Sequence, residues 1–96
     1  MNDITLPVNY NNLNRWQIRM IREEYIKQQA GICYYCGNPL DQEASISVMS
    51  RPINGEVFPD RFFEWPIHLH HDRVTGMTIG AVHCRCNAVL WQYEGK

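Results

Sequence analysis

The chain has 96 residues, of which 45% are hydrophobic and 20% are charged, and its formal net charge is -1. This composition excludes a disordered or low-complexity chain, and the length indicates one small domain whose thin core often needs a metal, a disulfide or a partner. The balanced charge excludes a uniformly basic nucleic-acid-binding protein, so any surface for DNA has to be local.

The four cysteines favour a metal site over disulfides. The first residues, Met1 to Thr5, have neither the basic nor the apolar segment of a secretory signal. No apolar run reaches the length of a membrane span, so we expect no membrane partner. We therefore expect a protein of the reducing cytoplasm, where paired cysteines more often bind zinc than cross-link.

The first third of the sequence predicts an arm followed by a helix. Residues 1–12 are polar and irregular, which is typical of an arm. Residues 13–30 have helical periodicity, with Asn12 or Asn14 as the N-cap and Gly31 as the C′ residue. The helix carries two apolar stripes, although a small domain needs only one. The second stripe predicts packing by the arm or a homodimer through this helix, unless the helix simply forms much of the core.

The middle third contains half of a metal site and an insertion. Residues 31–40 contain the run from Cys33 to Cys36 followed by a glycine, and two thiolates at this spacing can grip one zinc ion. Residues 41–64 form an insertion without evident chemistry. Its Asn54-Gly55 pair lies between short apolar runs and predicts a β-hairpin.

The last third predicts a strand–turn–strand–helix unit. Residues 65–71 alternate apolar side chains with histidines, as expected of a strand. A polar turn closed by glycine leads to the return strand over residues 77–82, in which Gly80 indicates a bulge or a close backbone approach. A short helix then begins at Cys84 or Cys86.

The cysteines and one histidine predict a structural zinc site. Cys33 and Cys36 supply two ligands, so a tetrahedral site needs two more from elsewhere in the chain. His83 and Cys86 repeat the two-residue gap of the first pair. We predict a zinc ion bound by Cys33, Cys36, His83 and Cys86. The alternative is Cys84 in place of His83, although a one-residue gap between cysteine ligands is unusual.

A second constellation, His70, His71 and Asn87, predicts catalysis. Adjacent strand residues normally point to opposite faces, but at the end of a strand both histidines can serve one site. His70 can bind a divalent metal, and the Asn87 amide oxygen can reach the same ion from the first turn of the helix. His71 can act as a general base, because neutral imidazole is available near neutral pH. The other interpretation is that these histidines are structural neighbours of the zinc site.

Three further residues lie near this constellation in the sequence. Arg73 and Arg85 flank it and are candidate contacts for nucleic-acid phosphates, although a solvated arginine is equally common. His68 shares the strand face of His70, and no role is assigned to it.

The motifs over residues 28–90 resemble those of the HNH nucleases, also called ββα-metal or His-Me finger nucleases. They are most similar to the branch that includes phage recombination endonuclease VII. The matching segments are C-Y-Y-C, L-H-H-D-R, G-M-T-I-G and H-C-R-C-N, in the order of that branch. The resemblance implies an α+β fold over residues 1–96, a small zinc-stabilised ββα-metal domain. Its core is residues 65–95, with an N-terminal helix and the inserted β-hairpin.

The resemblance also implies an activity, a metal-dependent endonuclease that hydrolyses phosphodiester bonds in DNA. Double-stranded DNA is the expected partner, cut to 5′-phosphate and 3′-hydroxyl ends in the cytoplasm of a bacterium or a phage-infected host cell. His71 matches the general base, and His70 and Asn87 match ligands of one catalytic Mg²⁺. Mn²⁺ or Ni²⁺ can substitute, because His70 stands where the branch has an aspartate. The cysteines of the predicted zinc site match zinc ligands.

The sequence departs from the pattern of that branch at several positions. Arg73 replaces a histidine, Ile79 replaces an arginine, and no third histidine follows Asn87. Roles of the replaced residues are therefore not carried over. The alternative function is a non-catalytic zinc-ribbon module that binds nucleic acid and has no specific need of His71.

Overall fold

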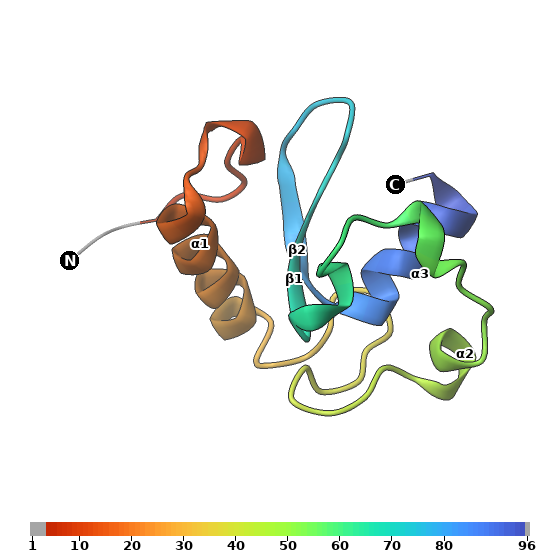
Figure 1. Ribbon diagram of the computed structural model, residues 1–96. Coiled ribbons are helices and arrows are strands. Elements are labelled where there is room, and N and C mark those ends of the chain that lie inside the picture. The colour runs from red at the N-terminus through yellow and green to blue at the C-terminus, as the bar shows by residue number, and fades with distance from the viewer. Residues whose placement is uncertain (1–3, 96) are drawn as a thin grey trace.

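A sheet of two strands lies at the centre of the molecule, with a helix on each side. The computed structural model describes residues 4–95, and Figure 1 shows α1 on one side of the β-hairpin and α3 on the other. The helices and strands are α1 (Arg15–Gln28), α2 (Ile46–Met49), β1 (Ile67–His71), β2 (Thr78–His83) and α3 (Cys84–Glu94). The predicted α+β class and the strand–turn–strand–helix order are confirmed. Within residues 4–95, no helix combines the length and apolarity of a membrane span.

Helix α1 begins and ends at hydrogen-bonded caps. The Asn14 side chain accepts from the Gln17 amide (2.8 Å) and the Gln17 side chain accepts from the Asn14 amide (2.9 Å), which is a capping box. At the other end, the amides of Ala30 and Gly31 donate to carbonyls of the last turn. The C-cap is Gln29, so the C′ residue is Ala30, with φ of 55°, and the following Gly31 is also left-handed, with φ of 74°. The prediction that Gly31 holds the C′ position was therefore wrong by one residue.

We expect Ala30→Gly to stabilise the protein by about 1 kcal/mol, because a side chain in the left-handed region is strained and glycine is not. Chemical denaturation in excess zinc measures the change. The matched control is Gln28→Gly inside α1, where the lost helix propensity should cost about 0.5–1 kcal/mol. A lower midpoint for Ala30→Gly would contradict the assigned helix end.

The hairpin is attached to α1 by side-chain hydrogen bonds as well as by apolar packing. Buried Tyr25 bonds the Thr78 hydroxyl (2.9 Å), and the Gln29 amide bonds both backbone groups of Ala81 (2.9 and 3.0 Å). This contact explains Gly80, because a Cβ there would lie 2.9 Å from Gln29 Oε1. The atoms that approach Gly80 belong to side chains and not to another backbone, and the β-bulge lies at the neighbouring Ile79.

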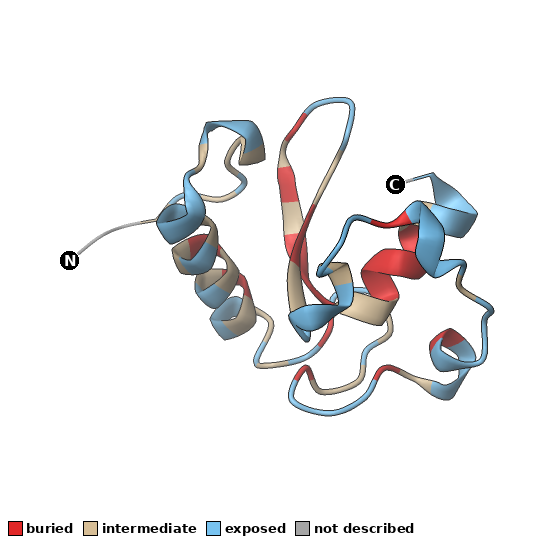
Figure 2. Cartoon of the chain, in the orientation of Figure 1, coloured by how far each residue is buried: buried red, intermediate tan, exposed pale blue. Residues whose placement is uncertain are grey.

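The core runs from the hairpin into α3. Figure 2 shows the buried residues concentrated on the strands and on the first two turns of α3. Burial on both faces of β2 explains its nearly continuous apolar sequence, since α1 covers one side and α3 the other. Apolar side chains described without exposed surface include those of Ala81, Val82, Cys86, Ala88 and Val89.

The predicted β-hairpin in residues 41–64 was wrong. This segment contains α2 and two 3-10 helices, Gly55–Val57 and Phe62–Glu64, and no strand. A two-residue hairpin of the Asn-Gly type needs positive φ at both central residues. Asn54 has φ of −88° instead, and its side chain accepts from the Glu56 amide (3.1 Å), so it caps a 3-10 turn. The Asn54 amide also donates to Gln92 of α3 (2.8 Å), which holds the turn against the helix.

The described part of the N-terminal arm packs along β2. The Thr78 amide donates to the Val8 carbonyl (2.8 Å), and the Tyr10 amide donates to the Gly76 carbonyl (2.8 Å). A 3-10 helix over Tyr10–Asn12 then leads into α1. These contacts bring residues from the start of the chain to the same end of the hairpin as His71. Residues 1–3 of the predicted arm lie outside the described residues.

Candidate functional site

Four metal-ligand atoms meet between the first cysteine pair and the start of α3. The Cys33 and Cys86 sulfurs are 3.7 Å apart, and His83 Nδ1 lies 3.5 Å from the sulfurs of both Cys36 and Cys86. All four ligand atoms lie within 4.8 Å of one another. Tetrahedral zinc with bonds of about 2.0–2.3 Å needs ligand separations in this range. The cluster can therefore hold a structural metal ion such as zinc.

The hydrogen bonds of His83 set the ring in a metal-binding state. His83 Nε2 lies 2.9 Å from the Pro39 carbonyl, which can only accept, so this nitrogen carries the proton. The unprotonated Nδ1 then faces the sulfurs. A histidine that donates its other ring nitrogen to a carbonyl is the usual arrangement around bound metals.

The sulfurs also have the electrostatic surroundings of a metal site. The hydrogen bond with Cys86 lowers the pKa of the Cys33 thiol to about 4, and the same contact raises the pKa of Cys86. The Tyr35 amide approaches the Cys33 sulfur at 3.4 Å, which further favours a thiolate. A thiolate is the form of cysteine that binds a metal ion.

Cys84 lies outside this cluster. It is half-buried at the start of α3, and burial raises the pKa of its thiol, which favours the neutral form. The predicted fourth ligand, His83 in preference to Cys84, agrees with the composition of the four-residue cluster. Cys86 and His83 reach the cluster because they lie three residues apart across the first turn of α3.

A second site lies in a cleft of about 1140 Å³ between α1, β1 and α3. Five of the nine Lys and Arg residues of the chain line this cleft, against two of its ten acidic residues. The basic surface is therefore local, as the neutral overall charge requires. The polar lining that matters for chemistry is His68, His70, His71, Asn87, Arg15, Arg19, Arg22, Arg61 and Arg73.

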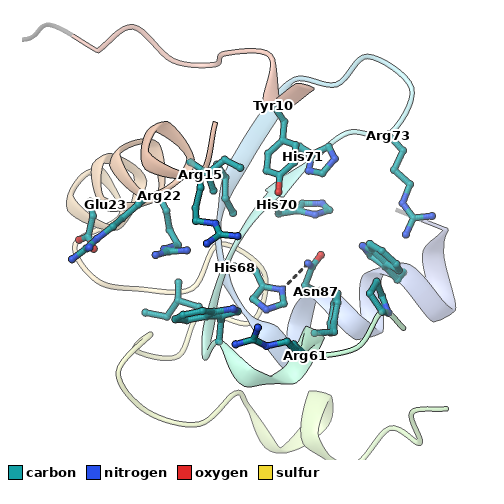
Figure 3. A pocket seen from close by; sticks show the side chains of 18 of the residues that line it. Tyr10, Arg15, Arg22, Glu23, Arg61, His68, His70, His71, Arg73 and Asn87 are labelled. Atoms are coloured by element: carbon teal, nitrogen blue, oxygen red, sulfur yellow. Dashed lines mark hydrogen bonds between the residues drawn. The ribbon is translucent and has the colours of Figure 1, made fainter. Parts of the chain in front are cut away.

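A β-bulge explains how two adjacent histidines reach one cleft. His70 pairs with Gly80 but His71 pairs with Thr78, so Ile79 is the extra residue and the register shifts between the two histidines. A bulge re-aims the side chains next to it, which removes the strict alternation of a regular strand. Both histidines line the cleft, and Figure 3 shows their rings on the same side of the hairpin.

His68 and Asn87 contact each other in the floor of the cleft. The Asn87 Nδ2 lies 3.0 Å from His68 Nδ1, and since an amide nitrogen only donates, His68 accepts. Burial lowers the pKa of His68, which keeps the ring neutral and able to accept. Figure 3 shows the Asn87 amide between the rings of His68 and His70. His68, which the sequence left without a role, therefore orients Asn87.

The oxygen of the Asn87 amide is buried and has no hydrogen-bond partner within the described residues. Such an atom typically costs about 1–3 kcal/mol, so a protein rarely retains it without a ligand. Amide oxygen is a ligand that Mg²⁺ and Ca²⁺ accept, and imidazole nitrogen suits Mn²⁺ and Ni²⁺. Asn87 Oδ1 and the buried His70 ring therefore fit the two ligands that the sequence predicts for a divalent ion.

The ring of His71 is held by Tyr10 of the N-terminal arm. The two rings stack face to face, with centroids 3.9 Å apart and planes 6° apart. Burial lowers the pKa of His71, with a smaller contribution from nearby Arg73, so the neutral form is favoured. Tyr10 was not identified from the sequence, because it lies far from His71 in the chain and an arm residue carries no motif.

The two arginines predicted to contact phosphates have different surroundings. Arg73 lines the cleft and lies over the Trp91 ring at 3.9 Å. Arg85 does not line it, and its Nη2 donates to the carbonyls of Met49 (3.3 Å) and Arg51 (2.7 Å). Arg85 thus tethers the connection that contains α2 to helix α3. The sequence also allowed Arg15, Arg19 and Arg22 of α1 either to contact phosphates or to form a solvated basic face, and all three line the cleft.

No protein-family model, curated protein or solved structure matches this chain. The assignment of function therefore depends on the residues and the geometry of the two sites.

Proposed function

We propose that the protein is a metal-dependent endonuclease of the HNH type that hydrolyses phosphodiester bonds in DNA. The observation that carries this proposal is the convergence of His70, His71 and the unpartnered Asn87 oxygen in one basic cleft. The order β1, β2, α3 and the nearby zinc cluster are what the sequence resemblance implies for this class.

The residues of the cleft divide the work of hydrolysis. His71 is neutral and half-buried, so an unprotonated ring nitrogen can take the proton from an attacking water. His70 and Asn87 Oδ1 would hold one divalent ion, which supplies charge stabilisation at the scissile phosphate and the leaving oxygen. Arg73, held over Trp91, offers a fixed cation for a neighbouring phosphate.

The direct test is cleavage by the purified, zinc-loaded protein. Supercoiled plasmid and end-labelled oligonucleotides, single-stranded and duplex, are incubated with added Mg²⁺, Mn²⁺ or Ni²⁺ and without added ion. We expect cleavage that requires the added ion and leaves 5′-phosphate ends. A protein that binds these nucleic acids and cuts none of them would be a zinc-ribbon binding module, and the nuclease proposal would fail.

Tyr10 should position the general base without reacting itself. We expect Tyr10→Ala to lower the cleavage rate by roughly tenfold, because the His71 ring loses the surface that holds it, whereas Tyr10→Phe keeps the stacking and the rate. Initial rates at saturating and limiting DNA separate a change in kcat from a change in KM, and positioning predicts the former. Equal losses for the alanine and phenylalanine variants would assign the effect to the hydroxyl instead.

A further inference from the structure

One wall of the cleft is a face of α1 that the proposed reaction does not use. Arg15, Arg19 and Arg22 recur at intervals of four and three residues, so they lie along one side of the helix. All three line the cleft, and none forms an ion pair within residues 4–95, where Arg61 and Glu64 make the single pair. Figure 3 shows Arg15 and Arg22 on the α1 side of the histidines and Arg73 on the opposite side.

Two tryptophans with largely exposed rings lie in the same cleft. Trp16 of α1 is 65% exposed and Trp65, which precedes β1, is 59% exposed. Neither ring contacts another aromatic or a cation among the described residues, whereas Trp91 packs against Phe58 and Phe62 beneath Arg73. Indole rings stack well on other flat rings, so two unstacked indoles that line a basic cleft are platforms for a ligand with flat faces.

From these two observations we propose that the cleft binds an unpaired nucleic-acid strand. The α1 arginines would contact its phosphates, and bases would stack on Trp16 and Trp65. Basic grooves with aromatic platforms are how proteins hold single strands, because every base has a face for stacking. In a duplex each base face is covered by its neighbour, so neither indole could be used. The strand would lie beside the proposed catalytic residues, and its role as a substrate rests on the proposed nuclease function. Binding of the strand is measured separately from cleavage.

Binding can be measured without cleavage. The zinc-loaded full chain, without added divalent ion, is titrated with a labelled DNA strand of about 12 nucleotides, the same strand in a duplex, and the matching RNA strand. Fluorescence anisotropy gives the affinities, and tryptophan emission reports stacking. We expect the unpaired strand to bind at least about tenfold more tightly than the duplex and to quench the emission. Comparison of the affinities for the DNA strand and the RNA strand shows whether the site prefers deoxyribose or ribose.

Paired variants separate stacking on the tryptophan rings from nonspecific hydrophobic or electrostatic binding. Trp16→Leu and Trp65→Leu should each weaken strand binding roughly 5- to 100-fold, while Trp16→Phe and Trp65→Phe should weaken it less than about threefold. Arg19→Ala should reduce affinity and its salt dependence, and Lys27→Ala, on α1 outside the cleft, should not. Duplex binding as tight as strand binding, or leucine variants that bind like wild type, would overturn the proposal.

The outcomes for binding and for cleavage are independent. A protein that binds the unpaired strand through its tryptophans but cuts nothing refutes the nuclease and leaves the strand site standing. A protein that cuts DNA with an added ion yet prefers the duplex refutes the strand site and leaves the nuclease standing.

Discussion

Cys36→Ser should abolish cooperative folding, whereas Cys84→Ser should leave the domain folded. Cys36 belongs to the four-residue cluster that joins the first cysteine pair to β2 and α3, and Cys84 does not. Structural zinc contributes about 10–16 kcal/mol to the folding of small zinc domains, which matches or exceeds the roughly 5–15 kcal/mol total stability of ordinary domains. Loss of one of the four ligands weakens an interaction whose total free energy is as large as the stability of the whole domain.

The two cysteine variants make a matched pair, since each replaces one thiol in the same part of the fold. Zinc content per chain, far-UV circular dichroism and a thermal melt are measured for both. We expect Cys36→Ser to lose zinc and its cooperative melt, and Cys84→Ser to bind one zinc with a stability change of roughly 1 kcal/mol or less. If Cys36→Ser retained zinc and Cys84→Ser lost it, the ligand would be Cys84 and not Cys36, and the assigned cluster would be wrong.

The second large effect is expected at His71. We expect His71→Gln to lower the rate of metal-dependent cleavage by about 10²- to 10⁴-fold, the usual contribution of a general base. Glutamine is polar, flat and uncharged, so it can keep a contact with the Tyr10 ring while losing the basic nitrogen. Single-turnover cleavage with excess protein measures the chemical step, and zinc content and thermal melt should match wild type.

Two further substitutions make the His71 test specific. Val74→Ala, in the adjacent turn and 95% exposed, should cleave like wild type. Asn87→Leu should lose cleavage, because it removes the amide oxygen that would hold the divalent ion and the hydrogen bond with His68. If His71→Gln cleaves at the wild-type rate, the general base lies elsewhere and the proposed mechanism is wrong.

The zinc cluster could be predicted because its information is local. Two ligands separated by two residues can meet on one ion with little help from the rest of the fold, so spacing alone identified Cys33, Cys36, His83 and Cys86. The alternation of apolar residues and histidines likewise predicted β1, because a strand with one covered face must alternate. The predicted ends of the two strands, residues 65–71 and 77–82, agree with the ends of β1 and β2 to within two residues.

The remaining features depend on contacts between distant parts of the chain. Asn54 has the sequence of a hairpin turn, but Gln92 of α3 binds its backbone and its own side chain caps a 3-10 turn. The stacking of Tyr10 on His71 and the hydrogen bond from Asn87 to His68 join residues that no local pattern relates. The bulge between His70 and His71 is also a property of the pair of strands, and a single strand does not reveal it.

Cys86 and Asn87 are consecutive residues of α3, yet one faces the zinc cluster and the other lines the cleft. Successive residues of an α-helix are rotated by about 100° around its axis, so this angle separates the metal-ligand cluster from the proposed catalytic residues. Because His83 and Cys86 are fixed in the metal-ligand cluster, the helix that follows them fixes the direction in which the Asn87 amide points. Insertion of one residue between Cys86 and Asn87 would leave all four cluster residues in the chain. It would also rotate Asn87 around the helix axis, away from His68 and His70.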